Sequence, residues 1–388
     1  MWAALLGIVA LLAVGCAGRG HLVYDVPAKD LGTLVDSDSA RDLLADLLAR
    51  QSIDPRLTAL APPSGPPDVF QEPATTADTD LPAPGDEARL RALSQEASLD
   101  FAALSFARAL GAQTTSRAAQ AAFHRFLQDG AADAEESLRR PGAFPYTVLF
   151  APSWMYQSHP ETGADFAYQR RLLDRLGVAH RLIPSRQDAS VEENAVAIAE
   201  AIRAEKHGGQ RLIVVSASKS GAEVALALSR VLLPEDAAGV VAWINIVGAL
   251  GGSPLADIAL RPPTSWLARS VFWLRGWDWA GMVSMGTQAS RGRLRGARMP
   301  DSITVVNVVA VPLSGSVGAT VWWGYQILRS HGPNDGAVLL VDTVWPGGIN
   351  LLAFGPDHLF APREDDAHGL AMLRAIAVAI QLRRLPSD

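Results

Sequence analysis

The sequence is poor in cysteine and in positive charge. Cys16 is the only cysteine among 388 residues, which excludes an internal disulfide and a zinc site built from several thiolates. The 34 basic residues are fewer than the 40 acidic ones, the net charge is −6, and no basic run occurs. The chain therefore has no electrostatic signature of nucleic-acid binding. With 49% hydrophobic and 19% charged residues, it is expected to form a large folded core.

The amino terminus carries an apolar run, Trp2 to Gly15, that is too short to span a bilayer. The small residues at its end directly precede Cys16. This pattern resembles the signal segment of bacterial lipoproteins, although the usual Lys or Arg near Met1 is missing. The resemblance implies a signal over residues 1–16, a lipid on Cys16, and export to the bacterial cell envelope with attachment to a membrane. The alternative is a plain secretory signal or a short membrane-associated helix, in which Cys16 has no role.

The next part of the chain shows helical patterns but no residues that suggest chemistry. Within the segment 17–61, apolar residues recur at helical spacing over 37–50 and predict one short helix. Residues 62–86 contain seven prolines among small polar residues, and this composition predicts a linker. Residues 87–141 are expected to form a helical accessory region.

A different rhythm begins near residue 142, where short apolar runs alternate with helical segments. This alternation is typical of a parallel sheet with helices on both faces. Strands are expected at 146–151, 180–184, 211–215, 240–247, 303–311 and 351–354. Residues 142–388 are therefore predicted to form one α/β domain.

A serine lies between a predicted strand and a predicted helix. The strand 211–215 is followed by Ser-Ala-Ser-Lys-Ser-Gly and then by the helix-forming residues 222–228. A chain that reverses directly from strand to helix needs small residues on both sides of the apex, and Ser216 and Ser220 meet this need. The apex, Ser218, would project its hydroxyl above the sheet, close to backbone N–H groups at the helix start. The alternative is an ordinary loop in which Ser218 or Ser220 caps the helix.

Further motifs follow downstream of this serine. Residues 252–257 read Gly-Ser-Pro-Leu-Ala-Asp, residues 334–338 read Asn-Asp-Gly-Ala-Val, and His358 comes directly after the last predicted strand. With Ser218, these motifs resemble the α/β-hydrolase family, and within it the bacterial lipases and esterases, over about 240 residues. The resemblance implies an α/β-hydrolase fold. It also implies a triad in which Ser218 is the nucleophile, His358 the general base and Asp335 the orienting acid.

Other residues compete for these roles. His331 and His368 are alternative bases, and Asp342 and Asp357 are alternative acids. A metal site built from Asp335, Asp357 and His358 is not supported, because their spacing matches neither a His-x-x-x-His nor an Asp-x-Asp pair. We therefore expect no metal and no cofactor.

The resemblance also implies an oxyanion hole made of two backbone N–H groups. One belongs to Lys219, directly after the nucleophile, and the other to Ser153 or Trp154 in the loop after the first strand of the domain. The glycine that the family usually has in this loop is absent. We expect the Lys219 side chain to reach solvent; the alternative is that its charge stabilises an anionic substrate or intermediate.

Aromatic residues concentrate between the fourth and fifth predicted strands. Four of the ten tryptophans lie within fourteen residues there: Trp266, Trp273, Trp277 and Trp279. This density predicts a cap over about residues 258–300 whose tryptophans line a hydrophobic substrate pocket. Contact with a membrane and packing in the core are the alternatives. The arginine-rich segment 290–298 is expected to be a solvated loop.

These observations predict a serine hydrolase that cleaves carboxylic esters of lipid-like or other hydrophobic acyl groups through an acyl-enzyme. Its partners would be the ester substrate and, through Cys16, a membrane. An acyltransferase or a thioesterase with the same triad is one alternative. A non-catalytic envelope protein that uses the fold and its aromatic cap for binding is another, because serines replace the usual glycines around Ser218.

Overall fold

The computed structural model describes residues 32–52, 86–129, 131–140, 142–206, 211–360 and 366–382. Cys16 and most of the predicted linker lie outside the described residues. None of the helices within these ranges combines the length and the apolar character needed to cross a membrane.

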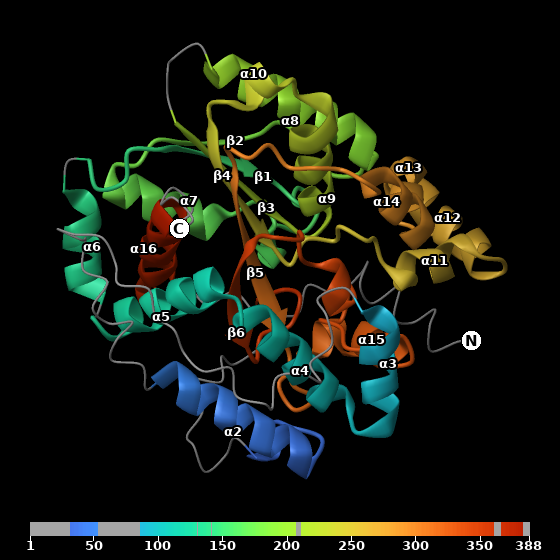
Figure 1. Ribbon diagram of the computed structural model, residues 1–388. Helices are drawn as coiled ribbons and strands as arrows, with labels where there is room; N and C mark the ends of the chain where they lie inside the picture. Colours follow the sequence, from blue (N-terminus) through green and yellow to red (C-terminus); the bar gives the residue numbers. More distant parts are fainter. Residues whose placement is uncertain are drawn as a thin grey trace.

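A six-stranded sheet forms the centre of the molecule (Figure 1). Its strands are β1 (Thr147–Ala151), β2 (His180–Leu182), β3 (Leu212–Ala217), β4 (Val240–Ile246), β5 (Thr304–Val311) and β6 (Ile349–Phe354). They lie in the order β2-β1-β3-β4-β5-β6, and all neighbours are parallel. The predicted α/β class with a parallel sheet is confirmed. β2 and β3 lie on opposite sides of β1, so the order in which strands are added to the sheet reverses between β1 and β3. Open α/β sheets place their ligand sites at such a reversal.

Helices cover both faces of the sheet, as the alternation of apolar residues requires. On β3, Leu212 and Val214 face α8 (Val191–Lys206) and α9 (Lys219–Leu226), whereas Ile213 and Val215 face the opposite core. That opposite core is closed by α5 (Thr114–Gln128), α6 (Ala131–Arg139), α7 (Ala167–Leu176) and α16 (Asp366–Leu382). Figure 1 shows α7 and α16 on the side of the sheet away from α8 and α9.

The segment between β4 and β5 is helical. It contains α11 (Pro254–Leu260), α12 (Thr264–Arg275), α13 (Trp279–Ser284) and α14 (Thr287–Leu294). The loop expected over 290–298 begins inside α14, and Arg293 is not solvated. Its guanidinium donates hydrogen bonds to Glu192 Oε1 and to the Ser284 carbonyl, both at 2.7 Å, because its position on α14 turns it toward α8.

The helices before residue 142 pack on the sheet. One core contains residues of β5, β6 and three helices: α2 (Asp38–Ser52), α3 (Glu87–Glu96) and α4 (Leu99–Gly111). A further helix, α15 (Ala319–Leu328), follows β5 in the chain. The observed α2 corresponds to the short helix predicted over 37–50. A domain boundary near residue 142 stays a prediction, although residues on both sides of it contribute to the same hydrophobic cores.

α5 also seals the free edge of β6. The Leu352 N–H donates to Gln120 Oε1 at 2.7 Å, and Gln120 Nε2 donates to the Leu352 carbonyl at 3.2 Å. The Asn350 N–H donates to Ser116 Oγ at 2.9 Å. Side chains of α5 therefore satisfy backbone groups that an open edge strand would offer to another chain.

Candidate active site

Ser218 lies at the sharp turn between β3 and α9, at the position predicted for a nucleophile. Its backbone has φ 51° and ψ −123°, a conformation that residues with a Cβ rarely adopt. Three backbone hydrogen bonds hold it there: the Ser218 N–H donates to the Ile246 carbonyl at 3.0 Å, and the Ser218 carbonyl accepts the N–H groups of Ala249 at 2.8 Å and Gly221 at 2.9 Å. The Ser218 side chain makes no capping hydrogen bond to α9. The hydroxyl is therefore available for another partner, and the alternative of Ser218 as a helix cap does not apply.

Small residues make this turn possible. Ser216 and Ser220 are both fully buried, and the Ser220 hydroxyl donates to the Ala151 carbonyl at 2.8 Å, which ties the turn to β1. Gly221 was not singled out from the sequence. A Cβ there would lie 2.6 Å from the Gly248 Cα, so only glycine lets α9 approach the loop after β4 this closely. The available signal was a glycine three positions after the serine, inside a helix pattern.

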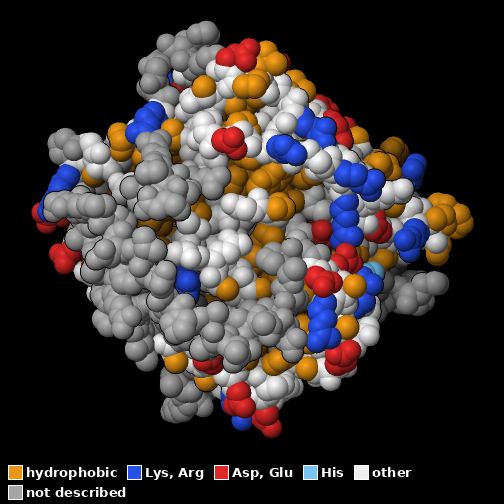
Figure 2. Space-filling model, viewed as in Figure 1, with side chains coloured by type: hydrophobic (Ala, Val, Ile, Leu, Met, Phe, Trp, Pro, Cys, Tyr) orange, Lys and Arg blue, Asp and Glu red, His pale blue; other side chains and the backbone are white. Residues whose placement is uncertain are grey.

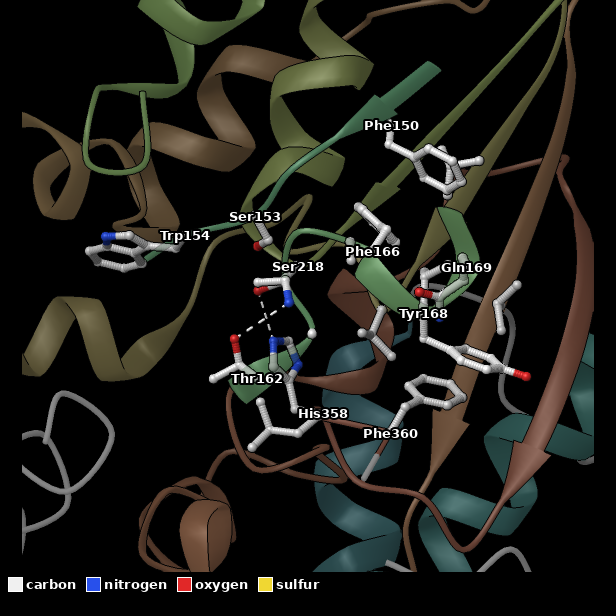
Figure 3. Close-up of a pocket in the computed structure, with 18 of the residues that line it drawn as sticks. Phe150, Ser153, Trp154, Thr162, Phe166, Tyr168, Gln169, Ser218, His358 and Phe360 are labelled. Atoms are coloured by element: carbon white, nitrogen blue, oxygen red, sulfur yellow. Dashed lines mark hydrogen bonds between the residues drawn. The ribbon is translucent and has the colours of Figure 1, made fainter. Parts of the chain in front are cut away.

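The structure brings the three predicted triad residues together, and Figure 3 shows two of them, Ser218 and His358. The Ser218 hydroxyl donates to His358 Nε2 at 2.8 Å, and His358 Nδ1 donates to Asp335 Oδ2 at 2.7 Å. Asp335 is fully buried, and its other carboxylate oxygen accepts the N–H groups of Ala337 (2.9 Å) and Val338 (2.8 Å). These bonds fix the carboxylate so that one oxygen faces the imidazole.

The alternative acids are engaged elsewhere. Asp357 accepts the backbone N–H groups of Gly318 and Leu359, and Asp342 forms an ion pair with Arg291. The Ser218 hydroxyl is bonded to His358 and to neither alternative histidine. Within the described ranges, no three side chains of His, Cys, Asp or Glu come together in a way that could hold a metal ion.

Asp335 changes the protonation behaviour of His358. Burial alone would lower the pKa of His358, because the imidazolium loses its hydration. The facing Asp335 carboxylate outweighs this effect through its charge and its hydrogen bond, and the pKa of His358 is raised above the usual 6.5. A base of this kind binds a proton readily during attack by the serine, provided that it starts neutral.

The predicted oxyanion donors separate into two groups. The Ser153 N–H donates to the Ala164 carbonyl at 2.9 Å and is therefore already used, because the loop after β1 folds back on itself. For the N–H groups of Trp154 and Lys219, the described part of the chain provides no acceptor. Trp154 and Lys219 remain the pair of donors that an oxyanion next to Ser218 could use.

The expectation that the Lys219 side chain reaches solvent is wrong. This side chain is 1% exposed and forms an ion pair with Glu223, one helical turn further along α9. Glu223 also accepts a hydrogen bond from Asn194 Nδ2 on α8 at 2.9 Å. Burial raises the pKa of Glu223 even though Lys219 opposes that change. A buried cation needs such a partner, and the pair ties α9 to α8 instead of facing the substrate.

Comparisons with known proteins agree with this architecture. No model of a protein family matches the sequence, and no curated protein matches it. A metagenomic carboxyl esterase superposes with a TM-score of 0.50, over 62% of this chain and 76% of its own, at 20% identity. The chain has the α/β-hydrolase fold. A lipase of Bacillus licheniformis in mature form gives a TM-score of 0.46 over 57% of this chain and 87% of its own, at 21% identity.

A cavity opens beside Ser218. Its volume is about 750 Å³, and Ser218, His358, Ser153 and Trp154 line it. Figure 3 shows Trp154 on one side of the Ser218–His358 pair and aromatic side chains on the other, among them Phe150 and Phe360. A hydrophobic group of a ligand could therefore lie directly against the serine.

The four tryptophans predicted to line the pocket do not line this cavity. Trp266 and Trp273 are 69% and 80% exposed on the outer side of α12. Trp277 and Trp279 pack around Phe272, and their ring centroids lie 5.6 and 5.1 Å, respectively, from the Phe272 ring centroid. The reason is the helical spacing of α12, which turns Phe272 inward and the neighbouring Trp273 outward. The segment 258–300 borders the cavity only through small and aliphatic side chains such as Ala259 and Met282.

Proposed function

We propose that this protein is a serine hydrolase that cleaves carboxylic esters of hydrophobic acyl groups through an acyl-enzyme on Ser218. The observation that supports the proposal most directly is the hydrogen-bonded series Ser218–His358–Asp335, whose Ser218 and His358 line an apolar cavity. The geometry of this series supports the proposed roles of Ser218 as nucleophile, His358 as base and Asp335 as orienting acid.

In the proposed reaction, Ser218 Oγ attacks the ester carbonyl while His358 Nε2 takes the hydroxyl proton. The N–H groups of Lys219 and Trp154 stabilise the oxyanion of the tetrahedral intermediate. Collapse of this intermediate breaks the bond to the alcohol, which leaves with the proton from His358. A water molecule then attacks the acyl-enzyme by the same route and releases the carboxylic acid.

Labelling with a fluorophosphonate probe tests the nucleophile. We expect the folded protein to be labelled, Ser218→Ala to abolish labelling, and His358→Ala to weaken it strongly. Ser270→Ala, which removes a hydroxyl from the outer side of α12, is the control and should be labelled normally. Absence of labelling in the folded wild-type protein would favour the non-catalytic binding protein. Formation of a new ester from an added alcohol would identify an acyltransferase.

A second proposal concerns membranes, and the exposed side of α12 favours it. Trp266, Trp273 and Leu274 are 69%, 80% and 73% exposed at positions that share one side of the helix. Arg269 and Arg275 lie on the same helix, beside Trp279 and Trp277 respectively. Figure 2 shows hydrophobic side chains projecting at the right-hand margin of the molecule, where Figure 1 places α12, with basic side chains nearby. Tryptophan and arginine together suit the headgroup region of an anionic bilayer.

We propose that α12 contacts the membrane and that a lipid on Cys16, with export to the cell envelope, holds the protein there. Sedimentation with vesicles that contain phosphatidylglycerol tests the helix, in a Cys16→Ser background so that a lipid cannot contribute. The double variant Trp266→Ser/Trp273→Ser should lose binding. The control is Trp322→Ser/Trp323→Ser, which removes two partly exposed tryptophans of α15 and should bind normally. Incorporation of labelled palmitate into wild type but not into Cys16→Ser would show the lipid.

A further inference from the structure

The apolar residues that line the cavity beside Ser218 belong to two different cores, one on each face of the sheet, and we call the corresponding parts of the cavity its two arms. The first arm lies under α11 and α13 and is bordered by Ala256, Ala259, Met282 and Met285. The second arm, called the deep arm below, runs between the sheet and the helices α7 and α16. Its apolar walls include Phe150, Phe166, Ile213, Val215, Met372 and Ile376.

Two independent walls give the depth of the deep arm. On β3, Ile213 lines the arm and lies five residues before Ser218, about 16 Å along the strand at 3.3 Å per residue. On α16, lining residues run from His368 to Ile376, about 12 Å along the helix at 1.5 Å per residue. The arm therefore extends well below the carboxyl edge of the sheet, into a region where protein interiors are normally filled.

The far end of the deep arm is closed. Phe144, Val148 and Ile376 border it there, and all three are buried. A closed end suits the part of the substrate that stays on the enzyme. The alcohol must leave before water can enter, whereas the acyl group remains on Ser218 through the covalent step.

From this geometry we propose that the deep arm binds the acyl chain of the substrate in an extended conformation, which makes long-chain esters the preferred substrate class. The inference rests on the proposed ester hydrolysis at Ser218. An extended polypeptide spans about 3.3–3.6 Å per residue, or about 1.2 Å for each of its three backbone bonds, and an extended acyl chain advances similarly. An arm about 12–16 Å long therefore accommodates a chain of roughly a dozen carbons. The first arm, bordered by α11 and α13, then receives the alcohol.

Chain-length profiles of kcat/KM with p-nitrophenyl esters from butyrate to palmitate test the proposal. Ile376→Phe fills the closed end. We expect butyrate hydrolysis to stay within about twofold of wild type and long-chain kcat/KM to fall about fourfold per excluded methylene. Val378→Phe is the matched control, because it adds a ring of the same size on α16 at a residue that does not line the cavity. It should leave the profile unchanged.

A second position measures depth. Val215 lines the arm three residues before Ser218, nearer to the serine than Ile213. Val215→Phe should therefore shorten the accepted chain more than Ile376→Phe does, and Ile376→Ala should lengthen it. Thermal unfolding shows which variants fold, and Ile376→Ala enlarges the arm without the risk of overpacking.

The outcomes separate the two proposals. If wild type hydrolyses butyrate but none of the folded variants changes the chain-length profile, the deep arm does not hold the acyl chain. If Ile376→Phe changes how kcat/KM depends on the length of the alcohol and not on the length of the acyl chain, the two arms are assigned the wrong way round and the inference fails. If wild type hydrolyses no ester of any length, the proposed function fails first.

Discussion

The outer side of α12 and the deep arm of the cavity are both apolar, but one faces solvent and the other is enclosed. α12 presents Trp266 and Trp273 to the outside, whereas the deep arm is bordered by side chains such as Val215 and Ile376. The difference shows that aromatic density along a sequence does not by itself locate a pocket. Here the exposed surface carries the conspicuous residues, and the cavity is built from residues that resemble ordinary core.

The two regions also differ in how the backbone is held. The cavity begins at a strained turn that is fixed by buried contacts around Ser218 and Gly221, whereas α12 ends at Gly276 with open space around it. Substitutions should therefore affect activity and stability strongly at the turn and weakly on α12. The following predictions test this contrast, beginning with the largest expected effect.

Asp335→Asn should lower kcat by about 10⁴-fold, because the imidazole loses the carboxylate that orients it. The acidic limb of the pH profile should move as well. In the wild type, the Asp335 charge raises the pKa of His358, and activity falls as pH drops through that raised pKa and the base becomes protonated. Without the charge the pKa falls, so residual activity should persist to lower pH. Asp301→Asn, at an exposed loop position, is the control and should change neither quantity.

Gly221→Ala should destabilise the protein by about 1–3 kcal/mol, because the new Cβ would press α9 away from Gly248. Activity should fall with stability, since α9 carries the Lys219 N–H. Gly276→Ala is the matched change on α12. Its φ of 66° imposes a cost of about 1 kcal/mol, but nothing lies near the added methyl group, so activity should be unchanged. Stability is measured by urea unfolding and activity by kinetic assays. An equal loss of activity in the two variants would contradict the contrast.

Ser218→Gly should remove activity and yet stabilise the fold by about 1 kcal/mol, because glycine adopts a positive φ without strain. Ser218→Ala keeps the Cβ and should give no such gain. Free energies of unfolding measured in urea distinguish the two variants. A lower stability of the glycine variant would mean that the turn is not strained.

Trp273→Ser should change the free energy of unfolding by less than about 0.5 kcal/mol, because the side chain is mostly exposed. Activity on a water-soluble ester should be the same as in the wild type. A loss of several degrees in the melting temperature would show that this tryptophan packs against the protein and is not free to contact a membrane.

The fold and the meeting of Ser218, His358 and Asp335 could be predicted because their signals are local. Ser218 and His358 each directly follow an apolar strand pattern, and Asp335 lies in a recognisable turn, so chain order placed them at one edge of a parallel sheet. The Trp154 alternative for the oxyanion hole could not be separated from Ser153, because an amide direction depends on how the loop folds back to Ala164.

The deep arm and the buried Lys219 could not be predicted, for a different reason. Ile213 and Val215 alternate as any buried strand residues do, and only the spacing between the sheet and α16 leaves a cavity beside them. For Lys219, the glutamate one helical turn later at Glu223 was a usable signal for an ion pair. Nothing in that spacing indicates that the pair is buried.

The hydrogen bonds between Gln120 and β6 have a consequence for any shortened form of the chain. A fragment that begins at residue 142 would lack α5 and leave the outward peptide groups of Leu352 and Asn350 exposed to other molecules. The bare edge of β6 would then be able to pair with a strand of another chain. α5 therefore shields this edge of the sheet from other chains, and an engineered minimal version has to retain it.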